Sequence, residues 1–301
     1  MTKAGSWIVS FRLRTLPLSV SPVILGSFLA KAFGQFSFLI FVLCILTTLF
    51  LQILSNLAND YGDMKSGADN DTRIGPARAL QKGEISMLEM KRMIYIFAFF
   101  ASISGLALVY YGTRFLNFTI FLVFIIIGIS AIAAAVKYTV GNKPYGYRAM
   151  GDIFVLIFFG PVATMGSFFL HSGFVRWDIM LPALTTGLMS VAVLNLNNMR
   201  DMENDNRSGK VTLAGILGRK KSKVYHALIL IFAIISSLTY TYFNYSGILH
   251  LIYIIVFIPL IFNIKAVIQN SIPSKLDIEL KKVALTALAY SVIFTVPYFF
   301  H

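Results

Sequence analysis

Long stretches without a single Asp, Glu, Lys or Arg divide this chain into a series of apolar segments. They cover residues 15–30, 32–59, 93–113, 115–136, 153–170, 179–199, 224–264 and 283–300. A helix needs about 20 apolar residues to cross the hydrocarbon core of a bilayer, and most of these stretches are long enough. The stretch 224–264 is too long for one helix, and the turn signal Asn244-Tyr245-Ser246-Gly247 divides it into two. The pattern therefore predicts an all-α polytopic membrane bundle of nine spanning helices.

Composition supports this interpretation. The chain is 57% hydrophobic and only 13% charged, whereas soluble domains carry about 25% charged residues. The net charge of +13 could suggest nucleic acid, but that interpretation needs a basic surface on a soluble domain. No soluble domain interrupts the apolar pattern, so residues 1–301 are expected to form a single membrane-embedded domain with no nucleic-acid partner. The first segment follows Arg12, Arg14 and Pro17 without a signal-peptide cleavage site, and is expected to be retained.

The basic residues are distributed unevenly between the two sets of connections. Nine spans place 23 of the 26 Lys and Arg on one side, and leave only Lys31, Arg114 and Arg176 on the other. Cytoplasmic loops are enriched in Lys and Arg. The asymmetry predicts a cytoplasmic N-terminus and a C-terminus outside. The long connections, at about 60–92, 137–152, 200–223 and 265–282, then face the cytoplasm, and function is expected there.

Acidic and amide residues cluster where the second and sixth spans end. Asn56, Asn59, Asp60 and Asp63 stand at i, i+3, i+4 and i+7, and Asn197, Asp201 and Asp205 at i, i+4 and i+8, which is one helix face in each case. Asn197 follows Asn59 by 138 residues, with four spans between the two clusters. The repetition predicts two related four-helix halves plus a ninth helix, with a shared site where the halves meet.

Carboxylates this close repel one another unless a cation lies among them. Oxygen ligands without His or Cys favour a hard ion, and Mg²⁺ fits best because it shares its ligands with substrate phosphates. The expected metal ligands are Asn59, Asp63, Asp69, Asn197, Asp201 and Asp205, and Asp60, Asp63 and Asp201 are expected to be catalytic. Basic residues follow each cluster and are expected to bind a diphosphate: Lys65, Arg73, Arg78, Lys82, Arg207 and Lys210.

Other acids on the same side favour a simpler interpretation. Asp71, Glu84, Glu89 and Glu203 lie outside the two stripes and are expected to be solvated loop acids. Asp277 and Glu279 are expected to balance charge in a loop.

Several motifs resemble the UbiA superfamily of intramembrane prenyltransferases. Asn59-Asp60-Tyr61-Gly62-Asp63, continued by Lys65-x-Gly67-x-Asp69 and Arg73-Ile74-Gly75-Pro76-x-Arg78, is similar to the first signature of the family. Asn198-x-Arg200-Asp201-x3-Asp205-x3-Gly209-Lys210 is similar to the second. The stretch from Tyr138 through Tyr147 to Gly151-Asp152 resembles the central loop of the branch that prenylates 1,4-dihydroxy-2-naphthoate for menaquinone. Arg12-x-Arg14-Thr15-Leu16-Pro17 matches the N-terminal entry of that branch.

The resemblance implies a bundle around a central cavity, with a lateral gap for a polyprenyl tail, in a bacterial cytoplasmic membrane. It implies Mg²⁺-dependent transfer of a polyprenyl group from a diphosphate to dihydroxynaphthoate, with loss of the ring carboxylate. Tyr138, Tyr147 and Asp152 are then central-loop residues of the site. Two alternatives remain open at this point: another aromatic acceptor, such as 4-hydroxybenzoate or haem, and a secondary transporter with internal repeats.

Overall fold

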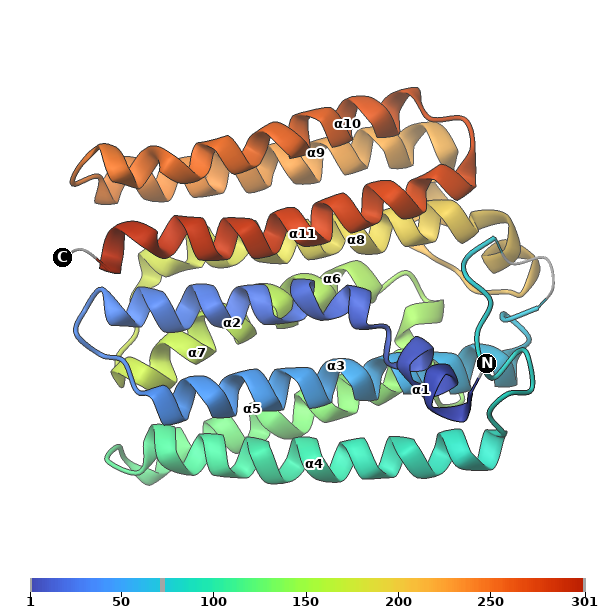
Figure 1. Cartoon of the computed structure of the whole chain (residues 1–301), viewed down its shortest axis with the longest axis horizontal. Coiled ribbons are helices and arrows are strands. Elements are labelled where there is room, and N and C mark those ends of the chain that lie inside the picture. The colour runs from blue at the N-terminus through green and yellow to red at the C-terminus, as the bar shows by residue number, and fades with distance from the viewer. Residues whose placement is uncertain (1, 71–73, 300–301) are drawn as a thin grey trace.

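A computed structural model describes residues 2–70 and 74–299 of the chain. Figure 1 shows long helices running side by side along one direction, with the two ends of the chain at opposite ends of the bundle. The helices are α1 Lys3–Phe11, α2 Leu16–Lys31, α3 Phe38–Ser66, α4 Met87–Thr113, α5 Phe118–Lys137, α6 Gly151–Ile157, α7 Ala163–Ser172, α8 Met180–Arg207, α9 Leu213–Asn244, α10 Ile258–Gln269 and α11 Leu276–Thr295.

The prediction of nine spans is confirmed for the described part of the chain. Nine segments there are long and apolar enough to cross a membrane: Lys3–Lys31, Phe38–Ser66, Met87–Thr113, Phe118–Lys137, Gly151–Ser172, Trp177–Arg207, Leu213–Asn244, Ile248–Gln269 and Pro273–Tyr298. The predicted break at Asn244 is present, because α9 ends there and a 3₁₀ segment, Ile248–Phe257, leads into α10. The protein is an integral membrane protein.

Polar residues at the segment ends set where the helices begin and stop. Ser86 and Glu89 form a reciprocal capping box at the start of α4, and the Asn117 side chain accepts a hydrogen bond from the backbone of Ile120 at the start of α5. Such caps satisfy backbone N–H groups that have no partner inside the helix. Gly67 ends α3 with a φ of 78°, a left-handed conformation that favours glycine.

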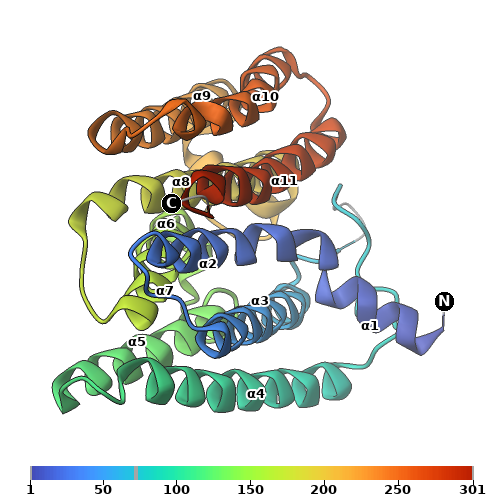
Figure 2. The same cartoon turned by 60° about the vertical axis from the view of Figure 1, so that its left-hand side comes forward.

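The two halves of the chain pack in a similar way. α3 packs along α4 in the first half, and α8 packs along α9 in the second. α2, in the first half, contacts α7 in the second half and also α11, as Figure 2 also shows. The ninth span, α11, packs against α2 and α8 and completes the bundle. The largest buried apolar cluster is formed mainly by α2, α8, α9 and α11, with contributions from the segments before α8 and around α10.

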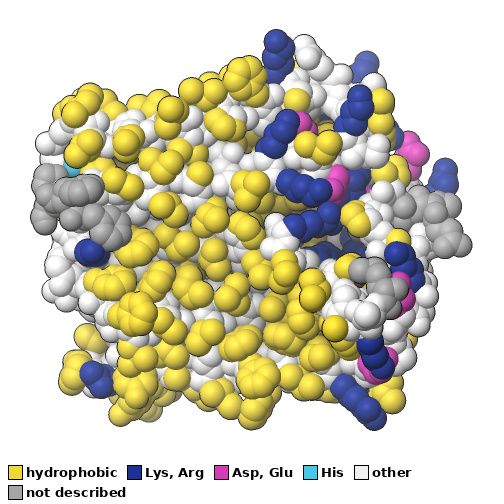
Figure 3. All heavy atoms as spheres, viewed as in Figure 1, with side chains coloured by type: hydrophobic (Ala, Val, Ile, Leu, Met, Phe, Trp, Pro, Cys, Tyr) yellow, Lys and Arg dark blue, Asp and Glu magenta, His cyan; other side chains and the backbone are white. Residues whose placement is uncertain are grey.

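Charge gathers at one end of the bundle, around the ends of α3 and α8. Figure 3 shows Lys, Arg, Asp and Glu crowded at this end, an apolar surface along the middle, and few charges at the opposite end. Both helices continue beyond their apolar stretches, α3 to Ser66 and α8 to Arg207. The connection expected at 200–223 is therefore shorter than predicted and covers only residues 208–212, because the second acidic cluster is part of α8.

Candidate active site

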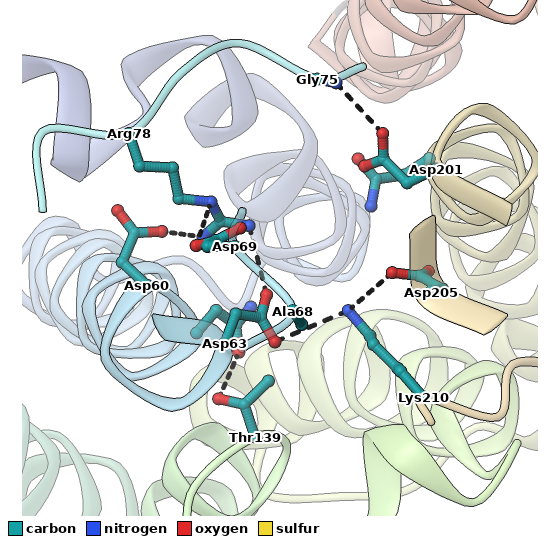
Figure 4. A network of polar contacts seen from close by, with 12 residues as sticks. Asp60, Asp63, Ala68, Asp69, Gly75, Arg78, Thr139, Asp201, Asp205 and Lys210 are labelled. Carbon is teal, nitrogen blue, oxygen red and sulfur yellow. Dashed lines mark hydrogen bonds and ion pairs between the residues drawn. The ribbon is translucent and has the colours of Figure 1, made fainter. Parts of the chain in front are cut away.

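All six predicted metal ligands line one cavity inside the bundle. The cavity has a volume of about 640 Å³. The lining ligands are Asn59 and Asp63 from α3, Asp69 from the segment that follows, and Asn197, Asp201 and Asp205 from α8. Figure 4 shows carboxylates from both clusters pointing toward the space between the two helix ends. The structure therefore brings together two clusters that are far apart in the sequence, as the repeated pattern predicts.

Arg78 lies at the centre of the first cluster. Its guanidinium pairs with Asp60, and lies 3.2 Å from Asp63 Oδ2 and 3.0 Å from Asp69 Oδ2. The side chain is only 8% exposed. Burial alone would lower the pKa of Arg78, but the three surrounding carboxylates outweigh burial and raise the pKa above its ordinary value. Arg78 is therefore a permanent cation that lines the cavity.

Lys210 connects the two clusters. Its Nζ lies 3.6 Å from Asp63 Oδ1 on α3 and 3.8 Å from Asp205 Oδ1 on α8. Burial works to lower the pKa of Lys210, but the two carboxylates outweigh it and raise the pKa. The lysine follows Gly209, whose φ of 73° turns the chain back after α8. One buried ammonium group thus contacts carboxylates from both halves of the site.

The central loop after α5 supports the first cluster. The Tyr147 hydroxyl donates a hydrogen bond of 2.8 Å to Asp63 Oδ1, and the Thr139 hydroxyl donates to the carbonyl of Ala58 at 2.9 Å. The loop can come this close because position 62 is a glycine: a Cβ there would lie 2.6 Å from atoms of Thr139. Burial and then the charge of Asp63 raise the pKa of Tyr147 above its ordinary value, so the phenol stays a neutral donor.

Backbone contacts join the first loop to the second helix. The N–H of Gly75 donates to Asp201 Oδ1 at 3.2 Å, and the Asn204 side chain donates to the carbonyl of Ala68 at 2.7 Å. Ala68 and Gly75, which both follow α3, therefore lie against the end of α8.

Some predicted site residues lie elsewhere in the described structure. Asp60 is 2% exposed and pairs with Arg12 and Arg78, but it does not line the cavity. Asp152 also lies outside the cavity lining and accepts a hydrogen bond of 3.2 Å from the Tyr225 hydroxyl. Three of the basic residues are exposed and away from the cavity: Lys65, Lys82 and Arg207. Arg73 lies outside the described residues.

Two cavity cations were missing from the predicted set. Arg12 and Arg14 both line the cavity, although they precede the first cluster by more than 40 residues. Arg12 reaches the site because its backbone is left-handed, with a φ of 50°, where the chain breaks between α1 and α2. In the sequence, these two arginines appear as a basic pair directly before an apolar segment. The positive-inside rule explains such a pair as well as a role in the site does.

Comparison with known proteins identifies the family. The sequence profile of the UbiA prenyltransferase family matches residues 19–294. The chain belongs to this family. It is also 43% identical, over 244 residues, to 1,4-dihydroxy-2-naphthoate octaprenyltransferase of Escherichia coli (strain K12), an alignment that covers 81% of this chain and 79% of the relative.

Solved structures of UbiA proteins share the fold. The apo structure of a UbiA homolog from Aeropyrum pernix K1 aligns with a TM-score of 0.69 at 16% identity, covering 95% of this chain and 97% of the other. A UbiA homolog from Archaeoglobus fulgidus bound to DMAPP and Mg²⁺ aligns with a TM-score of 0.55 at 18% identity, covering 94% and 99%. At identities this low, these matches establish the shared architecture alone.

Away from the UbiA signatures, the cavity wall is mainly apolar. Among its described lining residues, only Leu106 and Ile129 are exposed, by 55% and 62%. Leu106 lies on α4 and Ile129 on α5, so the lateral opening that the sequence predicts is expected between these helices. Gly128 lies beside this opening, and a Cβ there would meet nothing within 4 Å.

A π-helical turn, Phe158–Val162, shapes another part of the wall. From Phe154 to Ser167, the lining residues of this span recur in pairs every fourth position. A regular α-helix would rotate such pairs by about 40° per repeat, away from the cavity. The wider turn absorbs part of this rotation. It contains Pro161, whose missing N–H removes one helix hydrogen bond.

The residues at the polar end suit a hard divalent ion. The cavity-lining donors of the two signatures are carboxylates and carboxamides, all with oxygen atoms. Among residues 2–70 and 74–299, no three acidic, histidine or cysteine side chains converge into a closed metal-binding group. Arg78 and Lys210 lie between the carboxylates instead. A closed group is not required for Mg²⁺, which commonly binds through one or two carboxylates, waters and substrate phosphates.

Proposed function

We propose that this protein transfers a polyprenyl group from a polyprenyl diphosphate to 1,4-dihydroxy-2-naphthoate, with loss of the ring carboxylate, in menaquinone biosynthesis. The family assignment and the E. coli relative support this function. The observation that carries it is the two-part cavity. One end is lined by carboxylates and cations, and the rest is mainly apolar and includes the exposed Leu106 on α4 and Ile129 on α5. A diphosphate with a long hydrocarbon tail has the same two parts.

Charge balance at the polar end favours joint binding of a diphosphate and a metal. Among the described residues, four carboxylates and four cations line the cavity: Asp63, Asp69, Asp201 and Asp205, with Arg12, Arg14, Arg78 and Lys210. A diphosphate alone would bring several negative charges into a site that is otherwise neutral. A divalent cation that enters with it restores the balance. We propose Mg²⁺, held by Asn59, Asp63 and Asp69 from one half and by Asn197, Asp201 and Asp205 from the other.

The main role of the protein in this reaction is to stabilise the diphosphate as it leaves. The allylic C–O bond breaks and its electron pair leaves with the diphosphate. The ring carbon that carries the carboxylate attacks the allylic cation, a C–C bond forms there, and the carboxylate leaves as carbon dioxide. Arg78 and Lys210 bind the negative charge that develops on the leaving oxygen. A bound Mg²⁺ supplies further positive charge beside the phosphoryl oxygens.

Aromatic side chains line the cavity next to the polar end. The rings of Tyr145 and Phe154 are stacked with centroids 4.0 Å apart, and Phe158 continues the series 6.3 Å from Phe154. All three line the cavity. Aromatic rings stabilise a nearby cation through their negative faces and exclude the water that would otherwise capture it. We assign this wall to shielding of the allylic cation.

The site faces the cytoplasm of a bacterial inner membrane in this proposal. The charged end of the bundle in Figure 3 carries most of the Lys and Arg, and the positive-inside rule assigns such an end to the cytoplasm. The N-terminus is then cytoplasmic and the C-terminus outside. Thiol labelling in intact cells tests the orientation, with a cysteine placed at the exposed position Asn206. Labelling by an impermeant reagent from outside would contradict it.

A membrane assay tests the activity. Membranes that contain the protein are incubated with dihydroxynaphthoate, a polyprenyl diphosphate and Mg²⁺, each omitted in turn. We expect a prenylated product that lacks the carboxylate only when all three are present. Preferential turnover of 4-hydroxybenzoate or haem would change the acceptor. Uptake of an aromatic acid by vesicles without any prenyl diphosphate would favour the transporter alternative.

A further inference from the structure

A buried arginine holds two of the proposed metal ligands on α8. Arg200 Nη2 donates to Asn197 Oδ1 at 2.7 Å and to Asp201 Oδ2 at 2.7 Å, and its Nε donates to Asp201 Oδ1 at 3.0 Å. The side chain is 1% exposed. Arg200 itself does not line the cavity in the described structure. It therefore acts on the site through the orientation and charge of Asn197 and Asp201.

The remaining terminal nitrogen of Arg200 is bound by a residue from the last span. Arg200 Nη1 donates to Asp277 Oδ1 at 2.8 Å, and Asp277 lies in the first turn of α11. Asp277 also accepts two hydrogen bonds of 3.3 Å from Arg14, which lines the cavity. The expectation that Asp277 only balances charge in a loop is therefore wrong. It connects the entry segment, α8 and α11.

The contact between Asp277 and Arg200 affects both the orientation of the Arg200 guanidinium and the positive charge that acts on Asp201. A guanidinium is planar and presents its N–H groups in fixed directions, so an anchor on one edge fixes how the other edge meets its partners. Asp277 also shares the positive charge of Arg200. Without Asp277, that charge would act on Asp201 alone and would compete with a metal ion for its oxygens. Partners of metal ligands commonly change metal affinity by about 10- to 100-fold.

We propose that Asp277 is a positioning residue that sets the metal affinity of the second signature through Arg200. The inference rests on the proposed function, because it requires Asn197 and Asp201 to be metal ligands. It gives the ninth span, which lies outside the repeated halves, a role at their shared site. The Asp277 carboxylate also binds Arg14 on the cavity wall.

The test measures metal binding directly in the full-length protein. Wild type and Asp277→Asn are purified in detergent. Mn²⁺ is titrated in the presence of one equivalent of geranyl thiolodiphosphate, an unreactive diphosphate analogue, while the free ion is followed by electron paramagnetic resonance. We expect the Mn²⁺ dissociation constant to rise about tenfold or more in the variant. The Mg²⁺ concentration for half-maximal turnover should rise by a similar factor, and saturating Mg²⁺ should restore most of the rate. Asp277→Glu, which keeps the charge, should recover most of the affinity.

Two control variants change neighbouring contacts and spare Arg200. Lys281→Ala removes an exposed partner that lies 3.2 Å from Asp277. Glu279→Gln changes a carboxylate two residues away that is bonded to Asn263 and Lys282 instead of the site. Both should bind Mn²⁺ like wild type. Asp277→Ser provides a second neutral variant if Asp277→Asn aggregates, and thermal unfolding checks the fold of each.

The possible outcomes separate this inference from the proposed function. Wild-type Mn²⁺ affinity in folded Asp277→Asn or Asp277→Ser would overturn the positioning role and leave the metal site intact. An equal loss of affinity in Glu279→Gln would also overturn it, because the effect would then belong to the helix as a whole. A wild-type protein that adds no Mn²⁺ binding to that of the diphosphate analogue alone would overturn the proposed metal ligands, and the role of Asp277 with them.

Discussion

Lys210 Nζ lies 3.6 Å from Asp63 Oδ1, and this pair joins the second signature of the chain to the first. The lysine follows α8 and the carboxylate lies on α3, so the contact is possible only when both halves are assembled. Its geometry places a cation between the two clusters.

The first prediction concerns pH. The ordinary pKa of Lys210 is 10.5, and Asp63 and Asp205 raise it in spite of burial. A raised lysine pKa means that the charge, and whatever it stabilises, is present below the ordinary value and is lost only as the pH rises through the higher folded value. We expect turnover to show no loss attributable to Lys210 between about pH 8 and 10. A decline in this range that disappears in Lys210→Met would contradict the prediction.

The second prediction separates the proposed ligands from a neighbouring acid on the same helix. Asp201→Ala, and likewise Asp63→Ala, should reduce turnover by about 10²- to 10³-fold, because charge stabilisation of the leaving group is lost. Glu203→Ala is the matched control, because Glu203 lies between Asp201 and Asp205 on α8 but is exposed and pairs with Arg219. It should keep near wild-type activity. Equal losses in all variants at equal expression would indicate a general effect of surface charge.

The third prediction concerns the cations. Arg78→Ala should lose about 10²-fold or more in turnover, because Arg78 is buried among the carboxylates of the cavity. Lys65→Ala and Lys82→Ala should stay within about twofold of wild type, since both side chains are exposed and away from the cavity. Steady-state rates at matched protein levels measure the difference. A severe loss in Lys82→Ala would mean that the loop moves to bring this lysine to the substrate.

The fourth prediction concerns metal removal. Treatment with a chelator should abolish turnover, and Mg²⁺ added in excess should restore it, because the cavity-lining cations already balance the carboxylates. The protein should remain folded without metal, since the apolar spans determine its stability. Circular dichroism before and after chelation checks the fold. Full activity in protein shown to be free of metal would contradict the proposed site.

The fifth prediction concerns the path of the prenyl tail. Gly128→Trp narrows the lateral opening beside Ile129, so turnover of long-chain diphosphates should fall about tenfold or more relative to a geranyl-length substrate. Gly166→Trp is the matched control, because Gly166 also lines the cavity and a Cβ there would also meet nothing within 4 Å. Gly166 lies on α7, on a different wall. The same chain-length dependence in both variants would contradict an exit between α4 and α5.

Local patterns in the sequence were sufficient for the spans and the two acidic stripes. The length of an apolar run sets whether a helix can cross a bilayer, and this depends only on neighbouring residues. The spacing of Asn59 and Asp63, and of Asn197 and Asp201, likewise sets one helix face without any tertiary contact. The nine spans are confirmed in the described residues, and both stripes, except Asp60, line one cavity. The metal-binding and catalytic roles stay predictions.

Only the tertiary structure decided which charged groups meet at the site. The sequence placed six basic residues near the clusters, but a loop can turn each side chain inward or outward. Arg78 and Lys210 turn inward, while Lys65, Lys82 and Arg207 remain exposed. Arg14 and Asp277 are 263 residues apart and meet because α11 packs between α2 and α8. Such contacts depend on how distant helices pack, which no short-range spacing specifies, because the energy that selects them is shared across the whole bundle.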